Sequence, residues 1–424
     1  MEHQPYFRQI LSSIRDMIGI DSSQKPPLPG MPFGQGPADA LAAFLALAEE
    51  MGFETRNYDN YAGEVIFGEG EEFAILCHLD VVPAGEGWSH SPFGGEICDG
   101  RLYGRGTMDD KGPAVICLYC LKALKEEGFV PSRKIKLIVG CNEETGWACI
   151  DHYNQSAHMP EEGFTPDADF PVIYAEKGIL HLKLSVPIPD APFLSFAGGE
   201  ASNMVCAAAK AEVLSSDVKA ARVYGLSIRG GTLLSAGRPA HASTPELGEN
   251  ALEPLLRYFA EKNETAEKLC SMLFDDCLKL KEMRDETGNL TLSPNVALYE
   301  EGVLHITVDI RYPATFREED VLEKIEGTGF PFSVLHSQAP LYNDRDGTLI
   351  TTLLNVYNEI TGETREPIAI GGGTYARALR KGAGFGPQFL DEPSTIHQQD
   401  EYITLENIDR LYLIYKESIR RLTA

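Results

Sequence analysis

The sequence has little that would tie the protein to a membrane, to nucleic acid or to secretion. It contains no run of about eighteen apolar residues, so no membrane-spanning helix is expected. Its first residues, from Met1 to Pro5, lack a basic segment followed by an apolar stretch, so no secretory signal is expected. Positive charge is scarce, since 37 Lys and Arg face 63 Asp and Glu, for a net charge of −26. This excess repels nucleic-acid phosphates and anionic membranes, so neither is an expected partner.

Paired cysteines are also missing. The nine cysteines are odd in number and form no CxxC pair, which argues against a zinc or redox motif of that kind. Cys77, Cys117 and Cys141 lie in apolar runs and are predicted to be buried thiols. Together with the missing signal, they predict a reducing, cytoplasmic location. Solubility explains the negative charge most simply, and an attraction for cationic peptides is the alternative.

A chain of 424 residues is long enough for two or three domains. In the first part, amphipathic helices alternate with short apolar strands, an order that predicts βαβ units and a mostly parallel sheet. The expected helices span residues 5–19, 38–52 and 114–127, and the expected strands span residues 65–67, 73–77 and 135–139.

The pattern changes after Lys177. Residues 181–186 and 304–310 alternate between apolar and polar as half-exposed strands do, with helical segments between them at residues 248–262 and 262–283. Helical spacing returns at residues 348–360 and 405–421. The predicted fold class is therefore α/β. One domain, with a mostly parallel sheet flanked by helices, comprises residues 1–177 and 339–424, and an α+β domain is inserted at residues 178–338.

Three polar segments each follow an apolar run or a glycine-rich turn. His78 and Asp80 lie two residues apart at the end of a strand, so their side chains point the same way. Asp109 follows a glycine-rich loop and could bridge two metal ions. Glu143 and Glu144 form a pair in which one carboxylate can bind metal while the other accepts a proton. Because active sites of parallel sheets lie at the carboxyl ends of strands, the three segments together predict a site for two divalent cations.

Each segment taken singly has an ordinary structural explanation. His78 and Asp80 would be a surface pair at a strand end, Asp109 would belong to an acidic helix start that stabilises the helix dipole, and the two glutamates would form a solvated turn. The presence of all three, in order and each at a predicted strand end, favours the metal site.

The same segments resemble the signature of the M20 metallopeptidase family, and their flanks resemble its PepV-like and Sapep-like dipeptidase branch. The resemblance runs along nearly the whole chain. It implies a metal-dependent dipeptidase that removes the N-terminal residue of dipeptides, with the inserted domain as a lid over the catalytic domain. The matching segments are His78 to Gly85, Gly104 to Pro113, Glu143 to Gly146, Phe164 to Pro171, Gly372 to Arg377 and Ile396 to Gln398.

The resemblance also implies five metal ligands. His78 and Asp167 would lie on different metals, with Asp109 bridging both. Glu144 would join His78, and His397 would join Asp167. The three carboxylates and a bridging hydroxide would balance the four charges of two divalent cations. Zinc is expected, with manganese or cobalt as alternatives, since mixed histidine and carboxylate ligation suits all three.

Three residues are implied to take part in catalysis. Glu143 would be the general base that takes a proton from a metal-activated water. The carboxylate of Asp80 would orient the ring of His78. His241, in the segment Gly237 to Ala242, would stabilise the oxyanion of the tetrahedral intermediate. An ordinary polar loop histidine is the alternative for His241.

A substrate-binding role is implied for further residues. Asn203 and Arg311 resemble lid residues that contact the substrate. The turn at Gly372 and Gly373 would present backbone N–H groups to a substrate carboxylate, with Arg377 as a cationic partner. A purely structural glycine turn is the alternative.

Some features depart from the family pattern and leave other functions open. Cys77 stands where glycine is common, and Cys206 stands where dipeptidase relatives tend to have proline. The chain is also shorter than is typical of the branch, which leaves the pocket size open. The rival activity is N-acyl amino acid deacylation, and a non-catalytic binding protein on the same fold is the rival from another class. Small dipeptides are the expected partners, and a monomer is expected.

Overall fold

The computed structural model describes residues 4–214 and 218–424, which form two compact units. The first contains the chain up to Tyr174 together with Asn343–Ile368 and Thr374–Ala424. The second contains Ala175–Tyr342 and Ala369–Gly373. The division falls close to the predicted boundaries at residues 178 and 338. It differs at residues 369–373, which group with the second unit.

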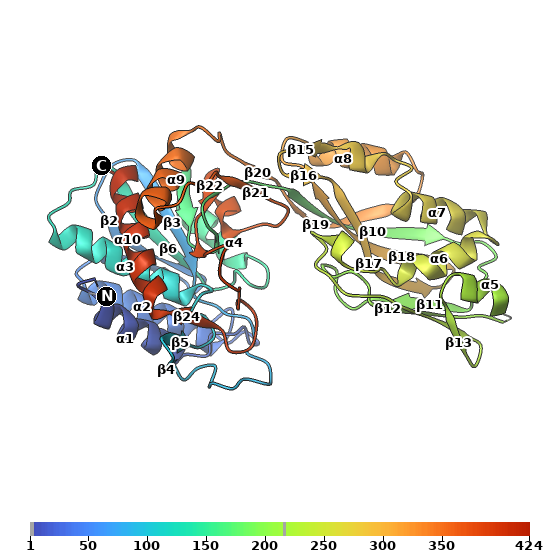
Figure 1. Cartoon of the computed structure of the whole chain (residues 1–424), viewed down its shortest axis with the longest axis horizontal. Coiled ribbons are helices and arrows are strands. Elements are labelled where there is room, and N and C mark those ends of the chain that lie inside the picture. The colour runs from blue at the N-terminus through green and yellow to red at the C-terminus, as the bar shows by residue number, and fades with distance from the viewer. Residues whose placement is uncertain (1–3, 215–217) are drawn as a thin grey trace. The chain divides into compact units, whose positions relative to one another are not determined.

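A mixed sheet forms the centre of the first unit (Figure 1). In spatial order its strands are β1 (Glu54–Tyr58), β2 (Ala62–Phe67), β6 (Lys134–Gly140), β3 (Glu72–His78), β7 (Glu162–Thr165), β22 (Lys381–Gly384) and β9 (Ile173–Glu176). The neighbouring pairs β6–β3, β3–β7 and β7–β22 are parallel, whereas β1–β2, β2–β6 and β22–β9 are antiparallel. The predicted parallel sheet is therefore confirmed at its centre, and its edges are antiparallel.

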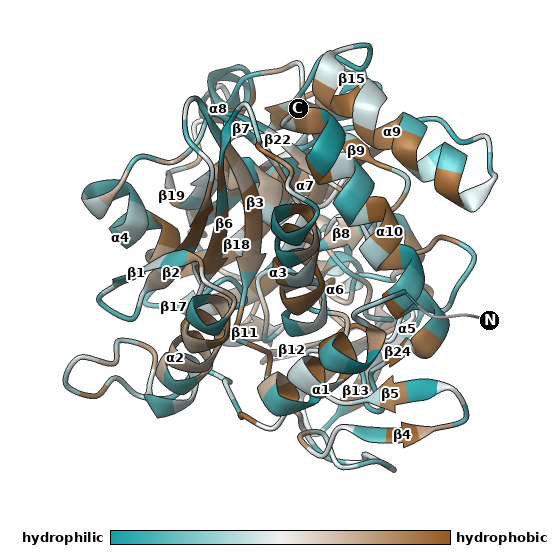
Figure 2. Cartoon of the chain, turned by 90° about the vertical axis from the view of Figure 1, so that its left-hand side faces the viewer, coloured by the Kyte–Doolittle hydropathy of each residue, from teal (hydrophilic) through white to brown (hydrophobic). Residues whose placement is uncertain are grey.

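The central strands are apolar because both faces of the sheet are covered. In β3 and β6 every residue after the first is buried, and Figure 2 shows these strands in brown between helices. Five helices confirm the predicted segments to within a few residues, namely α1 (Phe7–Ile18), α2 (Gln35–Glu50), α3 (Lys111–Glu126), α9 (Thr348–Thr361) and α10 (Leu405–Leu422). A further helix, α4 (Ala148–Ser156), was not predicted as a segment.

Helix α3 packs against β3, β6 and α10, whereas α2 and α4 contact β1 and β2. Short elements complete the unit. They are the three-stranded sheet of β4 (Glu96–Cys98), β5 (Arg101–Tyr103) and β24 (Tyr402–Thr404), the pair β8 (Ala168–Asp169) and β23 (Pro387–Gln388), and the 3-10 turn η3 (Tyr375–Ala378). Cys77, Cys117 and Cys141 are buried free thiols, as predicted.

An eight-stranded antiparallel sheet lies in the second unit, and the alternating segments at residues 181–186 and 304–310 fall in two of its strands. Its spatial order is β13 (Ser227–Arg229), β14 (Thr232–Ala236), β12 (Ala208–Glu212), β11 (Ser195–Gly198), β17 (Thr291–Glu300), β18 (Val303–Tyr312), β10 (Gly178–Pro187) and β19 (Phe332–Gln338). The unit also contains α5 (Val218–Val223), α6 (Leu252–Ala260), α7 (Glu264–Phe274), α8 (Glu318–Glu326), the turns η1 (Pro245–Leu247) and η2 (Leu280–Glu282), and the pair β15 (Arg284–Asp285) and β16 (Gly288–Asn289).

The helix predicted over residues 262–283 is too long, since α7 ends at Phe274. Asp276 follows with a φ of 53°, and its carboxylate accepts hydrogen bonds from the backbone N–H groups of Leu280 and Lys281. Aspartate side chains that bind nearby backbone groups compete with helical hydrogen bonding, which explains the early end.

The chain passes from the first unit to the second in β9 and returns in β20 (Leu341–Tyr342), and these two strands pair antiparallel. Strand β21 (Ile368–Ile370) also pairs with β9. Among the described helices, none has the length and apolar character needed to cross a membrane.

Candidate metal site

The predicted metal ligands of the first unit come from strand ends and from the loops beside them. Strand β3 ends at His78, which pairs in parallel register with Gly140 at the end of β6. The carboxylate pair Glu143 and Glu144 follows β6, and Asp167 follows β7. The carboxyl ends of neighbouring parallel strands meet at one edge of a sheet, so these groups are brought together by the topology itself.

Both histidines contact one carboxylate. His78 Nε2 lies 2.8 Å from Asp109 Oδ1, and His397 Nε2 lies 2.9 Å from Asp109 Oδ2. His78 Nε2 also lies 3.7 Å from Asp167 Oδ2, and His397 Nε2 lies 3.1 Å from Glu144 Oε2. Asp109 therefore presents one oxygen to each histidine, as a bridging carboxylate would, and all five expected ligands fall in one cluster.

The nearest contacts favour a different pairing of ligands from the one that the resemblance implied. They place His78 beside Asp167 and His397 beside Glu144. Glu144 is also within reach of His78, since one ligand atom from each of His78, Asp109 and Glu144 lies within 4.8 Å of the others. The pairing of the ligands therefore stays a prediction.

The cluster carries more negative charge than its histidines balance. Burial and the charge of Asp109 raise the pKa of Asp167 to about 7. Burial, followed by the charge of Asp167, raises the pKa of Glu143, and burial with the charge of Asp109 raises that of Glu144. Hydrogen bonds to Asp109 and Glu144 raise the pKa of His397 to about 10. Crowded, buried carboxylates that face two imidazole nitrogens are a donor set that fits a pair of divalent cations.

Asp80 joins two of the polar segments through different groups. Its backbone carbonyl lies 2.9 Å from His78 Nδ1, whereas its carboxylate lies 3.6 Å from that nitrogen. The carboxylate accepts hydrogen bonds from the backbone N–H groups of Glu143 at 3.0 Å and Glu144 at 3.1 Å. The predicted orienting role toward His78 thus belongs first to the carbonyl of Asp80, and its carboxylate fixes the turn that carries the two glutamates.

Trp147 is a site residue that sequence reasoning missed. Its indole Nε1 donates a hydrogen bond of 3.1 Å to Glu143 Oε1, and its ring meets that of Tyr375 edge-on at 5.2 Å between centroids. The indole therefore holds one oxygen of Glu143 in place. The available signal was its position four residues after Glu143 in the turn that leads into α4.

The second unit brings three other predicted residues near one another. The segment of Asn203 pairs with that of His241, since the N–H of Ala242 donates to the carbonyl of Asn203 at 2.9 Å. Partial burial, followed by the positive charge of Arg311, lowers the pKa of His241. The Nδ1 atom of His241 accepts a hydrogen bond of 3.2 Å from the backbone N–H of Ser243.

Arg311 is held by a carboxylate on its own strand, β18. Its Nε and Nη2 atoms lie 2.7 and 2.8 Å from the two carboxylate oxygens of Asp309. Asp309 is fully buried, and its Oδ2 also contacts Nε2 of His181 at 2.9 Å. The guanidinium is therefore fixed in direction before any ligand binds.

The predicted carboxylate-binding group divides between the units. Gly372 and Gly373 group with the second unit, whereas Arg377 lies in η3 of the first. Their joint role therefore stays a prediction.

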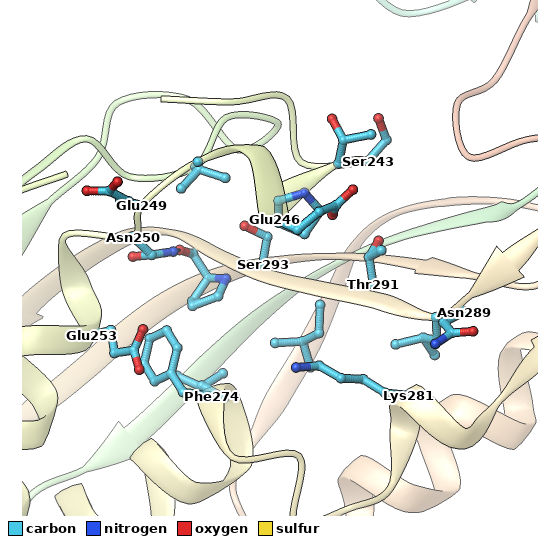
Figure 3. Close-up of a pocket in the computed structure, with 18 of the residues that line it drawn as sticks. Ser243, Glu246, Glu249, Asn250, Glu253, Phe274, Lys281, Asn289, Thr291 and Ser293 are labelled. Carbon is cyan, nitrogen blue, oxygen red and sulfur yellow. The ribbon is translucent and has the colours of Figure 1, made fainter. Parts of the chain in front are cut away.

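A pocket of about 910 Å³ lies within the second unit (Figure 3). In Figure 3, Glu249 and Glu253 lie at one end of its lining, and Lys281, Thr291 and Asn289 lie at the other. Ser243, the hydrogen-bond partner of His241, belongs to the lining, but His241 itself does not.

Known proteins that resemble this chain agree on one family. The sequence model of peptidase family M20/M25/M40 matches residues 74–421. "Putative dipeptidase YtjP" of Bacillus subtilis (strain 168) is 36% identical over 427 residues, covering 93% of this chain and 92% of that protein. The Beta-Ala-Xaa dipeptidase of Lactobacillus delbrueckii subsp. lactis is 34% identical over 453 residues, covering 98% and 96%. The crystal structure of aminopeptidase PepT from Bacillus cereus ATCC 10987 shares the fold, with a TM-score of 0.62, 14% identity and 99% of each chain covered.

Proposed function

Because the chain belongs to peptidase family M20/M25/M40, we propose that it is a metal-dependent dipeptidase that hydrolyses the peptide bond of dipeptides. The observation that carries this proposal is the contact of Asp109 with both His78 and His397, beside the carboxylate of Glu143. Two of the relatives reported above are named as dipeptidases, which supports the substrate class.

We propose that five side chains would hold a pair of divalent cations, His78 and Asp167 one of them and His397 and Glu144 the other, with Asp109, which contacts both histidines, shared between them. Zinc is the proposed metal, since two imidazoles and three carboxylates are ligands that zinc accepts, and manganese or cobalt is the alternative. When bound, the two cations would lower the pKa of a water molecule and polarise the peptide carbonyl.

Glu143 is proposed to move the proton. Its carboxylate would accept a proton from the attacking water and then deliver it to the leaving amine. Trp147 holds one of its oxygens, and the Asp80 carboxylate fixes its backbone, so the base is held in one direction. A side chain held in this way does not have to be ordered during the reaction, which favours catalysis.

His241 is proposed to stabilise the oxyanion. Because its Nδ1 accepts a hydrogen bond from Ser243, the proton of the neutral ring belongs on Nε2, which makes Nε2 a hydrogen-bond donor. The lowered pKa of His241 keeps the ring neutral at neutral pH. Asn203 and Arg311 are proposed to contact the substrate, and the fixed guanidinium of Arg311 suits a carboxylate.

A metal-reconstitution assay tests the proposal. Protein stripped with a chelator is reloaded with zinc, manganese or cobalt and assayed against dipeptides, tripeptides, dipeptides with blocked N-termini and N-acyl amino acids. We expect dipeptide hydrolysis that requires added metal. Preferred hydrolysis of N-acyl amino acids would replace the proposal with a deacylase. If no amide is hydrolysed with any metal although metal binds, a non-catalytic binding protein would be the better account.

The cysteines support a proposal for the cellular location. The buried thiols at Cys77, Cys117 and Cys141 fit a reducing compartment, and we therefore propose the cytoplasm.

A further inference from the structure

A buried carboxylate joins the two loops that carry Asp109 and His397. Glu401 is fully buried and lies four residues after His397, in the loop that leads into β24. Its Oε1 atom accepts hydrogen bonds from the backbone N–H groups of Gly106 at 3.1 Å, Met108 at 2.9 Å and Asp109 at 3.4 Å. These N–H groups converge on one oxygen and form an anion-binding site in the loop that ends at Asp109.

The other oxygen of Glu401 is bound by a buried arginine. Arg105 Nη1 donates to Glu401 Oε2, and Arg105 is 2% exposed. The guanidinium also lies over the ring of Trp88, at 5.2 Å from its centroid. In addition, the backbone carbonyl of Glu401 accepts a hydrogen bond of 2.9 Å from Gly104. Glu401 therefore holds the 104–109 loop through both its side chain and its backbone.

The loop of His397 depends on anchors of this kind. His397 has a φ of 61° and Asp400 a φ of 54°, in the left-handed region that is strained for residues with a side chain. Asp400 Oδ1 accepts hydrogen bonds from the backbone N–H groups of Ser89 and His90, at 2.8 and 3.0 Å. Glu401 is thus the group that ties this loop to the loop of Asp109, whereas Asp400 ties it to residues 89 and 90.

We propose that Glu401 is a positioning residue of the metal site, which fixes the backbone of Asp109 relative to that of His397. Both oxygens of its carboxylate are bound by Arg105 and by the backbone N–H groups of the 104–109 loop. Glu401 would therefore affect metal binding only through the positions of Asp109 and His397. Without Glu401, the two loops would still fold around Asp400 and the neighbouring strands, but the distance between Asp109 and His397 would vary more. This inference rests on the proposed function only in taking the cluster to hold divalent cations.

Glu401→Gln tests the proposal directly. The amide keeps the size of the side chain and an oxygen for the backbone N–H groups, but it loses the charge, and its NH2 group would face the donors of Arg105. Removing an outer partner of a metal ligand typically lowers metal affinity by about 10- to 100-fold. We expect a loss in that range for one of the two cations, measured by titrating metal-free protein with zinc against a competing chelator. Metal content per folded protein should fall from two to near one at limiting zinc.

A matched control separates this effect from a general loss of charge. Glu406 lies in the first turn of α10 and is exposed, so Glu406→Gln removes the same charge a few residues away without touching either loop. We expect wild-type zinc affinity for this variant. A purely structural role for Glu401 would lower the melting temperature of the metal-free protein and leave the zinc affinity of the folded fraction unchanged, and that result would overturn the proposal.

A second variant covers the case in which Glu401→Gln does not fold. Arg105→Lys keeps a positive charge beside Glu401 but loses the planar guanidinium, so a smaller fall in zinc affinity is expected. Unchanged affinity in a folded Arg105→Lys protein would then count against the proposal. Zinc titration needs no substrate, so an absence of dipeptide hydrolysis by the wild-type protein would refute the proposed function without deciding the role of Glu401.

Discussion

The candidate residues of the two units are held in different ways. In the first unit, His78 is fully buried, and its ring and backbone both contact neighbouring carboxylates. In the second unit, His241 lies on a loop, and the Nδ1 atom of its ring hydrogen-bonds to Ser243, two residues along the chain. The first unit therefore builds its cluster by its own folding, so metal binding should be independent of the second unit. The residues of the second unit should act on the substrate and on the transition state.

The largest effect is expected in the first unit, from Glu143→Gln. The amide keeps the shape of the side chain but cannot accept a proton, and general-base catalysis is typically worth about 10²- to 10⁴-fold. We expect kcat to fall by about 10⁴-fold, the upper end of that range. Elemental analysis should still find two metal ions per chain. Glu143→Ala should likewise nearly abolish turnover and retain metal.

The neighbouring glutamate provides the contrast. Glu144 contacts His397 in the cluster, so Glu144→Gln should lose metal as well as activity. Wild-type turnover in the Glu143 variants, or loss of metal from them, would show that the two carboxylates do not divide the roles of base and ligand.

The next largest effect is expected in the second unit, from His241→Ala. Loss of one oxyanion donor typically lowers kcat by about 10²- to 10³-fold, because the interaction is formed chiefly in the transition state. Metal content should remain that of the wild-type protein. Ser243→Ala leaves the backbone N–H that binds His241, so it should lower kcat less. A His241→Ala protein whose KM rises while kcat stays unchanged would assign the histidine to ground-state binding instead.

The clustering of the candidate metal ligands could be predicted from the sequence because several of them follow recognisable strand ends. His78, Glu143 and Asp167 each follow a strand of the parallel centre of the sheet, and parallel topology alone collects such residues at one edge. The pairing of ligands was not predictable in the same way. It depends on side-chain distances across loops, such as that between His397 and Glu144, which are separated by 253 residues.

Other features were missed because their cause is tertiary. Glu401 carries no local pattern that marks it, since its partners come from a distant segment. Trp147 is marked only by its position four residues after Glu143, and its contact with that residue depends on the shape of the turn between them. Strand β17 was also missed. It contains Pro294, and proline within a strand is typical of an edge or a bulge. The register of β17 against β18 shifts between Pro294 and Val296, so the proline lies at a bulge of a central strand.

The smallest effect is expected from Asp309→Asn. This variant tests whether the second unit holds the guanidinium of Arg311 as firmly as the first unit holds its candidate metal ligands. The substitution leaves Arg311 in place but replaces two charge-assisted hydrogen bonds by one neutral acceptor. A guanidinium that is free to turn binds a substrate carboxylate less well in the ground state and in the transition state alike. KM should therefore rise about five- to tenfold with kcat nearly unchanged. Asp190→Asn makes the same change at an exposed position of the same unit and should leave both constants unaltered. A fall in kcat at constant KM would mean that Arg311 acts on the transition state, as His241 is proposed to do, and not on substrate binding in the ground state.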